Sequence, residues 1–304
     1  YHNIFPASFI RQLKTIFMCG NLGDPCVSKD SLEAFRYFRG ISPRVWLSMN
    51  TNGGARDEEY WAELAKVFGR MGAIIFSIDG LEDTNHLYRQ KVNWNSVMRN
   101  AKAFINAGGR ARWDFIVFKH NEHQVEEAQQ LSNDMGFETF QFKKTGRFFS
   151  TARHKGKESH QAVNKKGELT QKLEKPKDKY VNKALHKEQE LVTKHGSMDN
   201  YYKQVKIDCK VKKEKSIFIT AEGMLMPCCW VGGQMYKWYL PPKHSDVWPF
   251  IDKQDLDVKT NSLRDVMNGP FLKAIENSWK DESRPKVCAN KCGVEFDAFR
   301  EQFT

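Results

Sequence analysis

The first half of the chain alternates short apolar runs with amphipathic runs, and this alternation limits the folds that it can adopt. Each apolar run is rich in β-branched and aromatic residues, and each amphipathic run repeats apolar residues at helical spacing and stops near a glycine. Strand–helix alternation of this kind predicts parallel strands with crossover helices. The expected strands are residues 15–20, 45–51, 73–80, 113–119 and 137–142, and the expected helices are residues 31–40, 57–72, 94–109 and 122–136.

Five strand–helix units fit part of a β/α barrel or an open doubly wound sheet. We expect an α/β fold class, with a partial (β/α) TIM-like barrel in residues 1–146 and a small C-terminal cysteine-rich α+β domain in residues 207–304. In the second domain, the run SIFITAEGMLMP indicates a β-hairpin with its turn at Ala221–Gly223. Residues 261–279 indicate one or two short helices broken at Gly269–Pro270.

Residues 147–206 separate these two parts as a basic linker or insertion with one polar helix, expected at 180–192. Residues 143–215 hold 21 basic and 9 acidic residues and so account for the whole net charge of +11. A basic face can attract nucleic acid, but lysine dominates here and few aromatic residues are interleaved with it. We therefore interpret the segment as a solvated insertion, with nucleic-acid binding as the less favoured alternative.

Hydropathy and cysteine content indicate the cellular compartment to expect for the protein. No stretch approaches the roughly 18 consecutive apolar residues of a membrane helix, so no membrane association is expected. The seven cysteines are an odd number in a chain of 304 residues, which does not suit a secreted disulfide framework. Metal ligands or buried thiols in a reducing cytoplasm suit the composition better.

Polar or glycine-rich residues follow four successive expected strands. The four loops contain CGNLGDPC, NTNGG, SIDG and KHNEH. Ligands of parallel β/α folds bind at the carboxyl ends of the strands, so four such loops at one edge predict a ligand site. Ordinary turn chemistry, which also uses Gly, Asn and Asp, is the alternative.

Four of the cysteines come from two separated segments that could close one metal site. Cys209 and Cys228 flank the expected hairpin, and Cys288 and Cys292 form a Cys-x3-Cys pair. Four thiolates suit a tetrahedral zinc ion or an iron–sulfur cubane, and spacing alone does not separate the two. Buried thiols without a metal are the remaining alternative.

The other three cysteines are not expected to be ligands. Cys229 follows Cys228 directly, and adjacent residues of an extended chain point to opposite faces. Cys19 is interpreted as a buried strand residue, and Cys26 as part of a loop.

Together these motifs resemble those of the radical S-adenosylmethionine (SAM) enzymes that carry a C-terminal SPASM or twitch-type auxiliary cluster domain. CGNLGDP is similar to the family's Gly-Gly-Glu-Pro motif, with Asp24 in the Glu position, and NTNG and SIDG are similar to the next strand ends. The spacing Cys-x13-Gly-x4-Cys, followed later by Cys-x3-Cys, and the run NSLRDVMNGPFLKAI resemble the auxiliary domain. The similarity covers residues 15–142 and 209–292.

The resemblance implies a SAM site along the strand ends. Gly23 and Asp24 would hold the amino group of SAM. Ser77 and Asp79 would lie near its ribose and carboxylate, and Arg89 can pair with that carboxylate. The implied SAM-binding residues are Gly20, Gly23, Asp24, Asn50, Asn52, Ser77, Asp79, Arg89 and Asn121.

The same resemblance implies the metal ligands and the chemistry. One auxiliary [4Fe–4S] cluster would be held by Cys209, Cys228, Cys288 and Cys292. Reductive cleavage of SAM at a second, radical-generating [4Fe–4S] cluster would yield a 5′-deoxyadenosyl radical that abstracts hydrogen from the substrate. The substrate is unknown, with a peptide or protein as the class that such domains accompany. An electron donor such as flavodoxin or ferredoxin would be a partner.

Part of the family pattern is missing. The Cys-x3-Cys-x2-Cys loop that holds the radical-generating cluster precedes the Gly-Gly-Glu motif by some tens of residues, and this chain begins too close to CGNLGDP to contain it. Because Tyr1 is not an initiator methionine, we expect the loop and its cluster on a missing N-terminal segment. The Cys-x2-Cys of a full SPASM set is also missing, which favours one auxiliary cluster over two.

Two other functions remain open on the sequence. A degenerate relative would keep the barrel and one cluster, and would serve in electron transfer or binding without radical chemistry. A zinc-stabilised nucleic-acid-binding protein would use the basic segment, but it leaves the four strand-end motifs unexplained.

Overall fold

The first half of the chain forms one five-stranded parallel sheet in the order β1-β2-β3-β4-β5. The structure is a computed structural model that describes residues 3–21, 23–148, 159–163, 168–236, 241–252, 254–297 and 302–303. The strands are β1 (Thr15–Met18), β2 (Trp46–Thr51), β3 (Gly72–Ser77), β4 (Ala111–Ile116) and β5 (Thr139–Lys143). The predicted α/β fold with successive parallel strands is therefore confirmed for this half.

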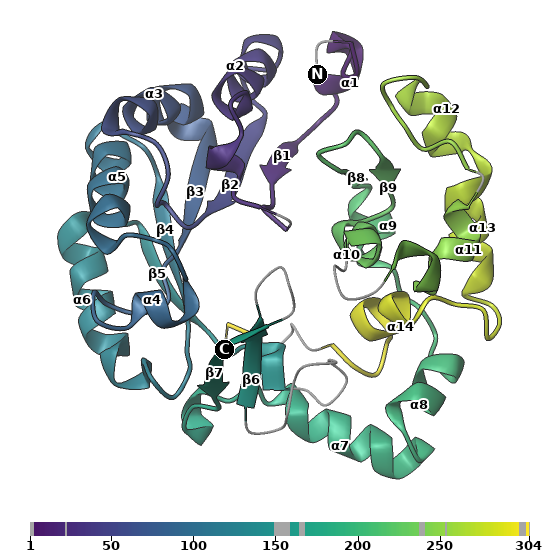
Figure 1. Ribbon diagram of the computed structural model, residues 1–304. Helices are drawn as coiled ribbons and strands as arrows, with labels where there is room; N and C mark the ends of the chain where they lie inside the picture. The colour runs from purple at the N-terminus through teal and green to yellow at the C-terminus, as the bar shows by residue number, and fades with distance from the viewer. Residues whose placement is uncertain are drawn as a thin grey trace.

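Helices cover one face of this sheet (Figure 1), and the four longest are those that helical periodicity predicts. They are α2 (Ser31–Ile41), α3 (Glu58–Phe68), α5 (Trp94–Asn106) and α6 (Val125–Met135), with the short α4 (Asn85–Tyr88) before α5. Local signals fix their ends. The Asp57 side chain accepts a hydrogen bond from the Tyr60 N–H at 2.9 Å at the start of α3. Gly136 adopts a left-handed conformation, with φ of 85°, at the end of α6.

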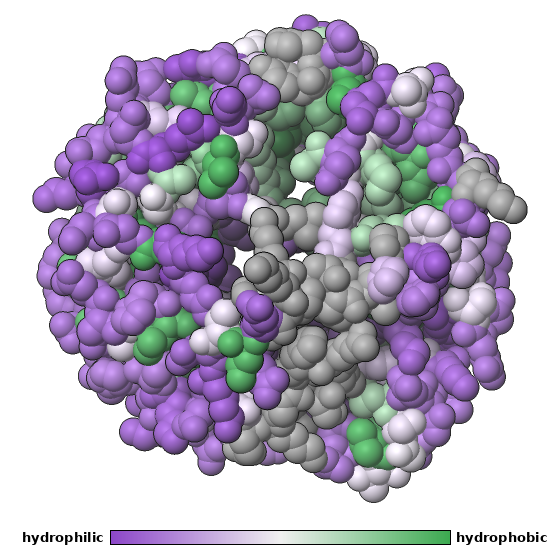
Figure 2. Space-filling view, in the orientation of Figure 1, coloured by the Kyte–Doolittle hydropathy of each residue, from purple (hydrophilic) through white to green (hydrophobic). Residues whose placement is uncertain are grey.

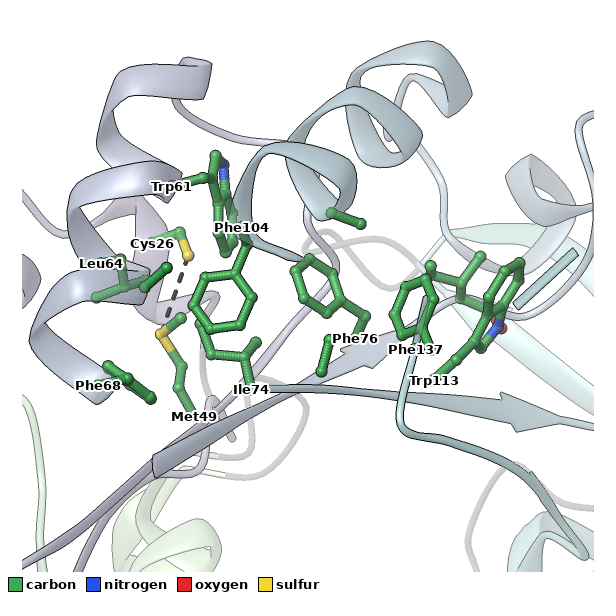
Figure 3. Packing of buried hydrophobic residues seen from close by; sticks show 14 of the residues in the cluster. Cys26, Met49, Trp61, Leu64, Phe68, Ile74, Phe76, Phe104, Trp113 and Phe137 are labelled. Carbon is green, nitrogen blue, oxygen red and sulfur yellow. Dashed lines mark hydrogen bonds between the residues drawn. The ribbon is translucent and has the colours of Figure 1, made fainter. Parts of the chain in front are cut away.

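The main core lies between the sheet and these helices and is rich in aromatic rings (Figure 3). Trp61, Phe76 and Phe104 pack against one another, and Trp113 packs against Phe137 further along the sheet. Because successive strand residues point to opposite faces, the alternate residues of the strands lie on the inner face of the open barrel.

One cysteine of the first strand-end loop lies where the sequence predicts it, and the other does not. Cys26 lies in the loop between β1 and α2, as predicted, within a short 3-10 turn, η1 (Pro25–Val27), and it is fully buried with its Sγ 3.9 Å from the Met49 Sδ (Figure 3). The turn forms because the Asp24 carboxylate accepts a hydrogen bond from the Cys26 N–H at 3.0 Å. Cys19 is not a buried strand residue: β1 ends at Met18, and Cys19 is half-buried just beyond it.

The basic segment holds more regular structure than the single polar helix that the sequence indicates. Leu173, in this segment, is 1% exposed and packs against apolar residues of the barrel half. Residues 149–158 and 164–167 of the segment lie outside the described part of the chain. Its elements are the antiparallel pair β6 (Ser159–Val163) and β7 (Leu169–Glu174), then α7 (Ala184–His195), which overlaps the predicted helix, and α8 (Met198–Gln204).

The C-terminal part combines a small hairpin with short helices. The predicted hairpin consists of β8 (Phe218–Ile219) and β9 (Leu225–Met226), and Gly223 in its turn has φ of 95°. The predicted break at Gly269–Pro270 separates α12 from α13. The helices are α9 (Lys210–Glu214), α10 (Cys229–Gly233), α11 (Trp248–Ile251), α12 (Leu263–Asn268), α13 (Pro270–Ser278) and α14 (Lys286–Cys292).

The two halves face each other, and the short helix α1 (Ala7–Ile10) lies between them at one end (Figure 1). Phe5, just before α1, packs against both the barrel core and the C-terminal core. At the other end, α7 and α8 connect the halves, and Figure 2 shows a hollow between them beside β1 and the β8–β9 hairpin. Every helix in the described part of the chain is too short or too polar to span a bilayer.

Candidate functional site

The carboxyl ends of β1 and β2 meet at one edge of the sheet, and Asp24 ties them together. Its carboxylate accepts hydrogen bonds from the Thr51 hydroxyl at 3.0 Å and from the Asn52 N–H at 2.6 Å, in addition to the one from Cys26. Asp24 therefore fixes the spacing of the first two strand-end loops. This residue, which stands in the Glu position of the family motif, shapes the edge at which the resemblance places SAM.

The two glycines of the first loop have different surroundings. Gly20 has φ of 64°, and a Cβ there would lie 3.2 Å from the Gly23 carbonyl oxygen and 3.3 Å from the Asn50 carbonyl oxygen. At Gly23 a Cβ would meet no atom within 4 Å. Gly20 is therefore required where the loop packs on β2, whereas Gly23 borders open space.

The two asparagines at the end of β2 also differ. The Asn52 Oδ1 accepts a hydrogen bond from the Gly54 N–H at 2.9 Å, which closes a tight turn. The Asn50 Oδ1 is buried and has no hydrogen-bond partner among the described residues. A buried acceptor without a partner is costly, so Asn50 offers a bound molecule a polar atom that the chain does not use.

The end of β3 leads into a buried ion pair. Asp79 is fully buried, with its Oδ2 2.5 Å from the Arg89 Nε, and its Oδ1 accepts a hydrogen bond from the Ile116 N–H at 2.6 Å. Burial is the largest single influence and lowers the pKa of Arg89, but the charges of Asp79, Tyr88 and Asp24 and the hydrogen bond to Asp79 together outweigh it and raise the pKa. Arg89 is therefore a permanent cation. Its side chain is 25% exposed, and it lies with the half-buried Ser77 at the edge of the sheet.

Asn121, beyond β4, is fully buried and is engaged within the chain. Its Nδ2 donates to the Asp79 carbonyl at 2.8 Å and to the Ile116 carbonyl at 2.9 Å, and its Oδ1 accepts from the Phe118 N–H at 2.7 Å. Asn121 therefore holds the loop after β4 against the loop after β3.

The four cysteines predicted as metal ligands line one cavity in the C-terminal part. Cys209 directly precedes α9 and Cys228 directly precedes α10, whereas Cys288 and Cys292 lie one turn apart on α14. The Asp208 N–H donates to the Cys292 carbonyl at 2.7 Å and so holds the start of α9 beside the end of α14. The remainder of the cavity lining is mostly apolar.

These four thiols differ in acidity. Burial raises the pKa of Cys228 to about 11 and that of Cys288 to about 12. A hydrogen bond with the Cys292 thiol lowers the pKa of Cys209 to about 6, and the same bond raises the pKa of Cys292. The thiolate is the form that binds metal, and the positive charge of a bound metal favours that form at every ligand.

Four thiols are a donor set that zinc ions and iron–sulfur clusters both use. In the described part of the chain, no three His, Cys, Asp or Glu side chains are placed to hold a single metal ion. A cubane is wider than one ion and binds each thiolate through a different iron. Trp279 also lines the cavity with its Nε1 buried, and its hydrogen bond to the Cys288 thiol lowers the pKa of that thiol against the larger effect of burial. An N–H donor of this kind can serve a cluster sulfur.

The remaining cysteines lie outside this cavity. Cys229 begins α10, and its thiol meets the Cys19 thiol at the end of β1, so that this pair joins the two halves. The contact with Cys19 lowers the pKa of Cys229 to about 6 and raises the pKa of Cys19. Cys229, which is not predicted to be a ligand, thus has a different neighbour from Cys228.

Sequence reasoning missed a charged cluster on the inner face of the sheet. Arg112 and Asp114 alternate along β4 with the buried Trp113 and Phe115, and Lys143 of β5 reaches the same aspartate. The signal was present in the sequence, as two charged residues at every second position of an otherwise apolar strand.

The chain resembles known proteins in structure rather than in sequence. No protein-family model and no curated protein sequence matches it. The crystal structure of Streptococcus suis SuiB matches with 12% identity and a TM-score of 0.50, over 86% of this chain and 57% of SuiB. SuiB bound to S-adenosylmethionine matches with 12% identity and a TM-score of 0.50, over 94% of this chain and 66% of that chain. This chain thus spans less than two thirds of the length of SuiB, and the likeness shows a shared fold.

Proposed function

We propose that the protein is a radical SAM enzyme with one auxiliary [4Fe–4S] cluster and a peptide or protein as its substrate. The observation that carries this proposal is the convergence of Cys209, Cys228, Cys288 and Cys292 on one cavity. The fold shared with SuiB, which has been crystallised with S-adenosylmethionine bound, supports SAM as the cofactor. An electron donor such as flavodoxin or ferredoxin would complete the system.

In this proposal, SAM binds at the carboxyl edge of β1, β2 and β3. Arg89 is permanently charged and partly exposed, which suits the SAM carboxylate. The unused acceptor of Asn50 suits the SAM amino group. Asp24 and Asn121 position these groups by locking neighbouring loops together.

The chain's own contribution to the reaction would be binding, orientation and exclusion of water, because SAM and a reduced radical-generating cluster, separate from the auxiliary cluster, would supply the hydrogen-abstracting chemistry. The auxiliary cluster would be held by the four cysteines of the cavity, and Trp279 would donate a hydrogen bond to one of its sulfurs.

Metal analysis tests the cluster assignment. The chain is purified and reconstituted without oxygen, and iron, sulfide and zinc are measured per chain. We expect about four iron and four sulfide ions, the content of one cubane. Replacing Cys209, Cys228, Cys288 or Cys292 by Ala should remove most of the iron. Cys229→Ala is the matched control, since it alters the adjacent thiol, and it should keep the iron. Zinc without sulfide, or equal loss in Cys229→Ala, would contradict the assignment.

Calorimetry with SAM tests the cofactor edge separately. Asn50→Ala should weaken SAM binding by about ten-fold, because a hydrogen bond to a charged group is lost. Ser48→Ala is the control, since the Ser48 hydroxyl on the same strand already donates to the Ala73 carbonyl at 2.9 Å. An unchanged affinity in Asn50→Ala would remove that residue from the site.

A further inference from the structure

The inner face of the barrel sheet carries a compact group of charges, Arg112, Asp114 and Lys143, which we call the inner-face cluster. Asp114 is 1% exposed, with its Oδ1 2.7 Å from the Arg112 Nε and its Oδ2 3.0 Å from an Arg112 terminal nitrogen. The Lys143 ammonium also pairs with Asp114 Oδ2. Two cations therefore share one carboxylate, and the cluster keeps one excess positive charge on the side that faces away from the core.

The chain's own C-terminal residues lie on this cluster. The Phe303 ring centroid is 5.2 Å from the Lys143 Nζ and 6.0 Å from the Arg112 Cζ, so the ring rests against both cations. The Gln302 carbonyl accepts a hydrogen bond from the Lys144 N–H at 2.8 Å. Gln302 therefore lies beside the carboxyl end of β5, which ends at Lys143.

This contact has the form of a bound peptide. β5 is the edge strand of the sheet, and an edge strand leaves backbone groups free to pair with another segment. Lys144, the first residue after β5, donates one backbone hydrogen bond to the Gln302 carbonyl, and the side chain of the next residue, Phe303, packs on two cations. Backbone pairing supplies affinity in this mode, and the side-chain position supplies specificity.

The contact is suited to exchange. Phe303 remains 42% exposed although it touches both cations, and exposed cation–π contacts are weak. A tail on the same chain binds mainly because its effective concentration is high. A second peptide that offered the same backbone carbonyl and aromatic ring could replace it.

We propose that the inner-face cluster is a peptide-binding site that takes an aromatic side chain together with the preceding backbone carbonyl, and that Gln302 and Phe303 occupy it until a substrate peptide displaces them. This inference rests on the peptide substrate class of the proposed function. It assigns peptide binding to the inner face of the barrel sheet.

Fluorescence anisotropy with a labelled peptide of residues 300–304 (Arg-Glu-Gln-Phe-Thr) tests the site. The peptide is added to the full chain and to its Phe303→Ala variant, which vacates the aromatic position. We expect the variant to bind the peptide at least about ten-fold more tightly than the unaltered chain, because competition from the tail is removed. The same peptide with Phe replaced by Ala should bind neither chain.

Variants in the cluster locate the binding. Lys143→Met and Arg112→Lys, each combined with Phe303→Ala, should weaken peptide binding by about ten-fold. Arg110→Met is the matched control, since Arg110 also pairs with a carboxylate, Glu138, at 2.8 Å and stacks on an aromatic ring, Trp46, but away from the tail. Thermal unfolding of each variant verifies that it folds.

Two results would overturn the proposal. The first is that Phe303→Ala lowers the unfolding temperature and binds no peptide, which would make the tail contact purely structural. The second is peptide binding that survives both cluster substitutions. The assay needs neither SAM nor iron, so its failure leaves the proposed function standing, and failure of the metal or SAM tests leaves the peptide result standing.

Discussion

At the scale of the residue, the two glycines and the aspartate of the first strand-end loop have different structural roles. Gly20 and Gly23 are both implied to bind SAM by resemblance, yet only Gly20 has a positive φ and close neighbours on three sides. The nearby Asp24 fixes the loop through hydrogen bonds within the chain. Gly20 and Asp24 therefore shape the loop itself through contacts within the chain.

Gly20→Ala should lower the free energy of unfolding by about 1–3 kcal/mol, because an L-residue is strained at this φ and its Cβ would crowd two carbonyl oxygens. Gly23→Ala is the control and should change the free energy of unfolding little, since no atom lies within 4 Å of the added methyl group. Urea denaturation of both variants makes the comparison, and equal losses would contradict it.

The burial of His120 predicts how the free energy of unfolding depends on pH. Burial lowers its pKa, against the attraction of Asp79 and with small contributions from His123 and His86. Its ring stacks on Phe118 at 5.5 Å, and its Nε2 is buried without a partner among the described residues. Below pH of about 6.5 the unfolded state binds a proton that the folded state resists, so stability falls as the pH falls.

We therefore expect His120→Phe to lose less stability than the unaltered chain between pH 7.5 and pH 5.5, as measured by urea denaturation at several pH values. His123→Gln, at an exposed neighbouring position, should keep the original pH dependence. A parallel pH dependence in the His120→Phe variant and the unaltered chain would show that His120 does not carry the effect.

At the scale of the element, the basic segment is docked on the barrel through β7. Leu173 packs with Ile116, Phe118 and Phe148, and the Lys119 N–H donates to the Glu174 carbonyl at 3.1 Å. The sequence indicated the polar helix of this segment but not the β6–β7 pair. β7 buries one apolar side chain, Leu173, among polar ones. It therefore lacks the regular alternation of apolar and polar residues that predicts a strand.

Leu173→Ala should lower the free energy of unfolding by about 2–5 kcal/mol, because it opens a cavity at a fully packed contact. Leu169→Ala, in the same strand but at a side chain that is 58% exposed, should have a much smaller effect. Chemical denaturation of the two variants tests this, and a small loss in Leu173→Ala would mean that the strand does not depend on the barrel.

The elements of the barrel half were easier to predict because each carries its own signal. Strands such as β3 are continuous apolar runs, and helices such as α3 and α6 show caps and a regular apolar face. The position of Cys19 was missed because an apolar run does not show where pairing stops. Cysteine spacing indicated that Cys209, Cys228, Cys288 and Cys292 could share one site, and they line one cavity. The meeting of Cys19 with Cys229 depends on how the halves pack and had no local signal.

At the scale of the whole molecule, the N-terminal segment joins the two cores. Phe5 packs against both of them, its ring lies 5.6 Å from that of Phe38 on α2, and its carbonyl accepts a hydrogen bond from the Tyr37 hydroxyl at 2.9 Å. Cooperative unfolding requires such shared contacts, because otherwise each core can open by itself.

Phe5→Ala should therefore broaden thermal unfolding or split it into two transitions, as followed by calorimetry. Phe17→Ala, which removes a ring that is 46% exposed on β1, should leave a single transition. If Phe5→Ala unfolds as cooperatively as the unaltered chain, the coupling between the halves lies elsewhere.

The placement of the four cavity cysteines has a consequence for how the C-terminal part keeps its shape. Cys209 and Cys228 stand at the starts of two short helices, and Cys288 and Cys292 stand far along the chain on α14. A cluster bonded to all of them would act as a covalent staple that closes a long stretch of chain and restricts its unfolded state. The C-terminal part would then resist proteolysis better with iron bound than without it. The barrel sheet, which is stabilised by its own core, would resist proteolysis equally in both cases.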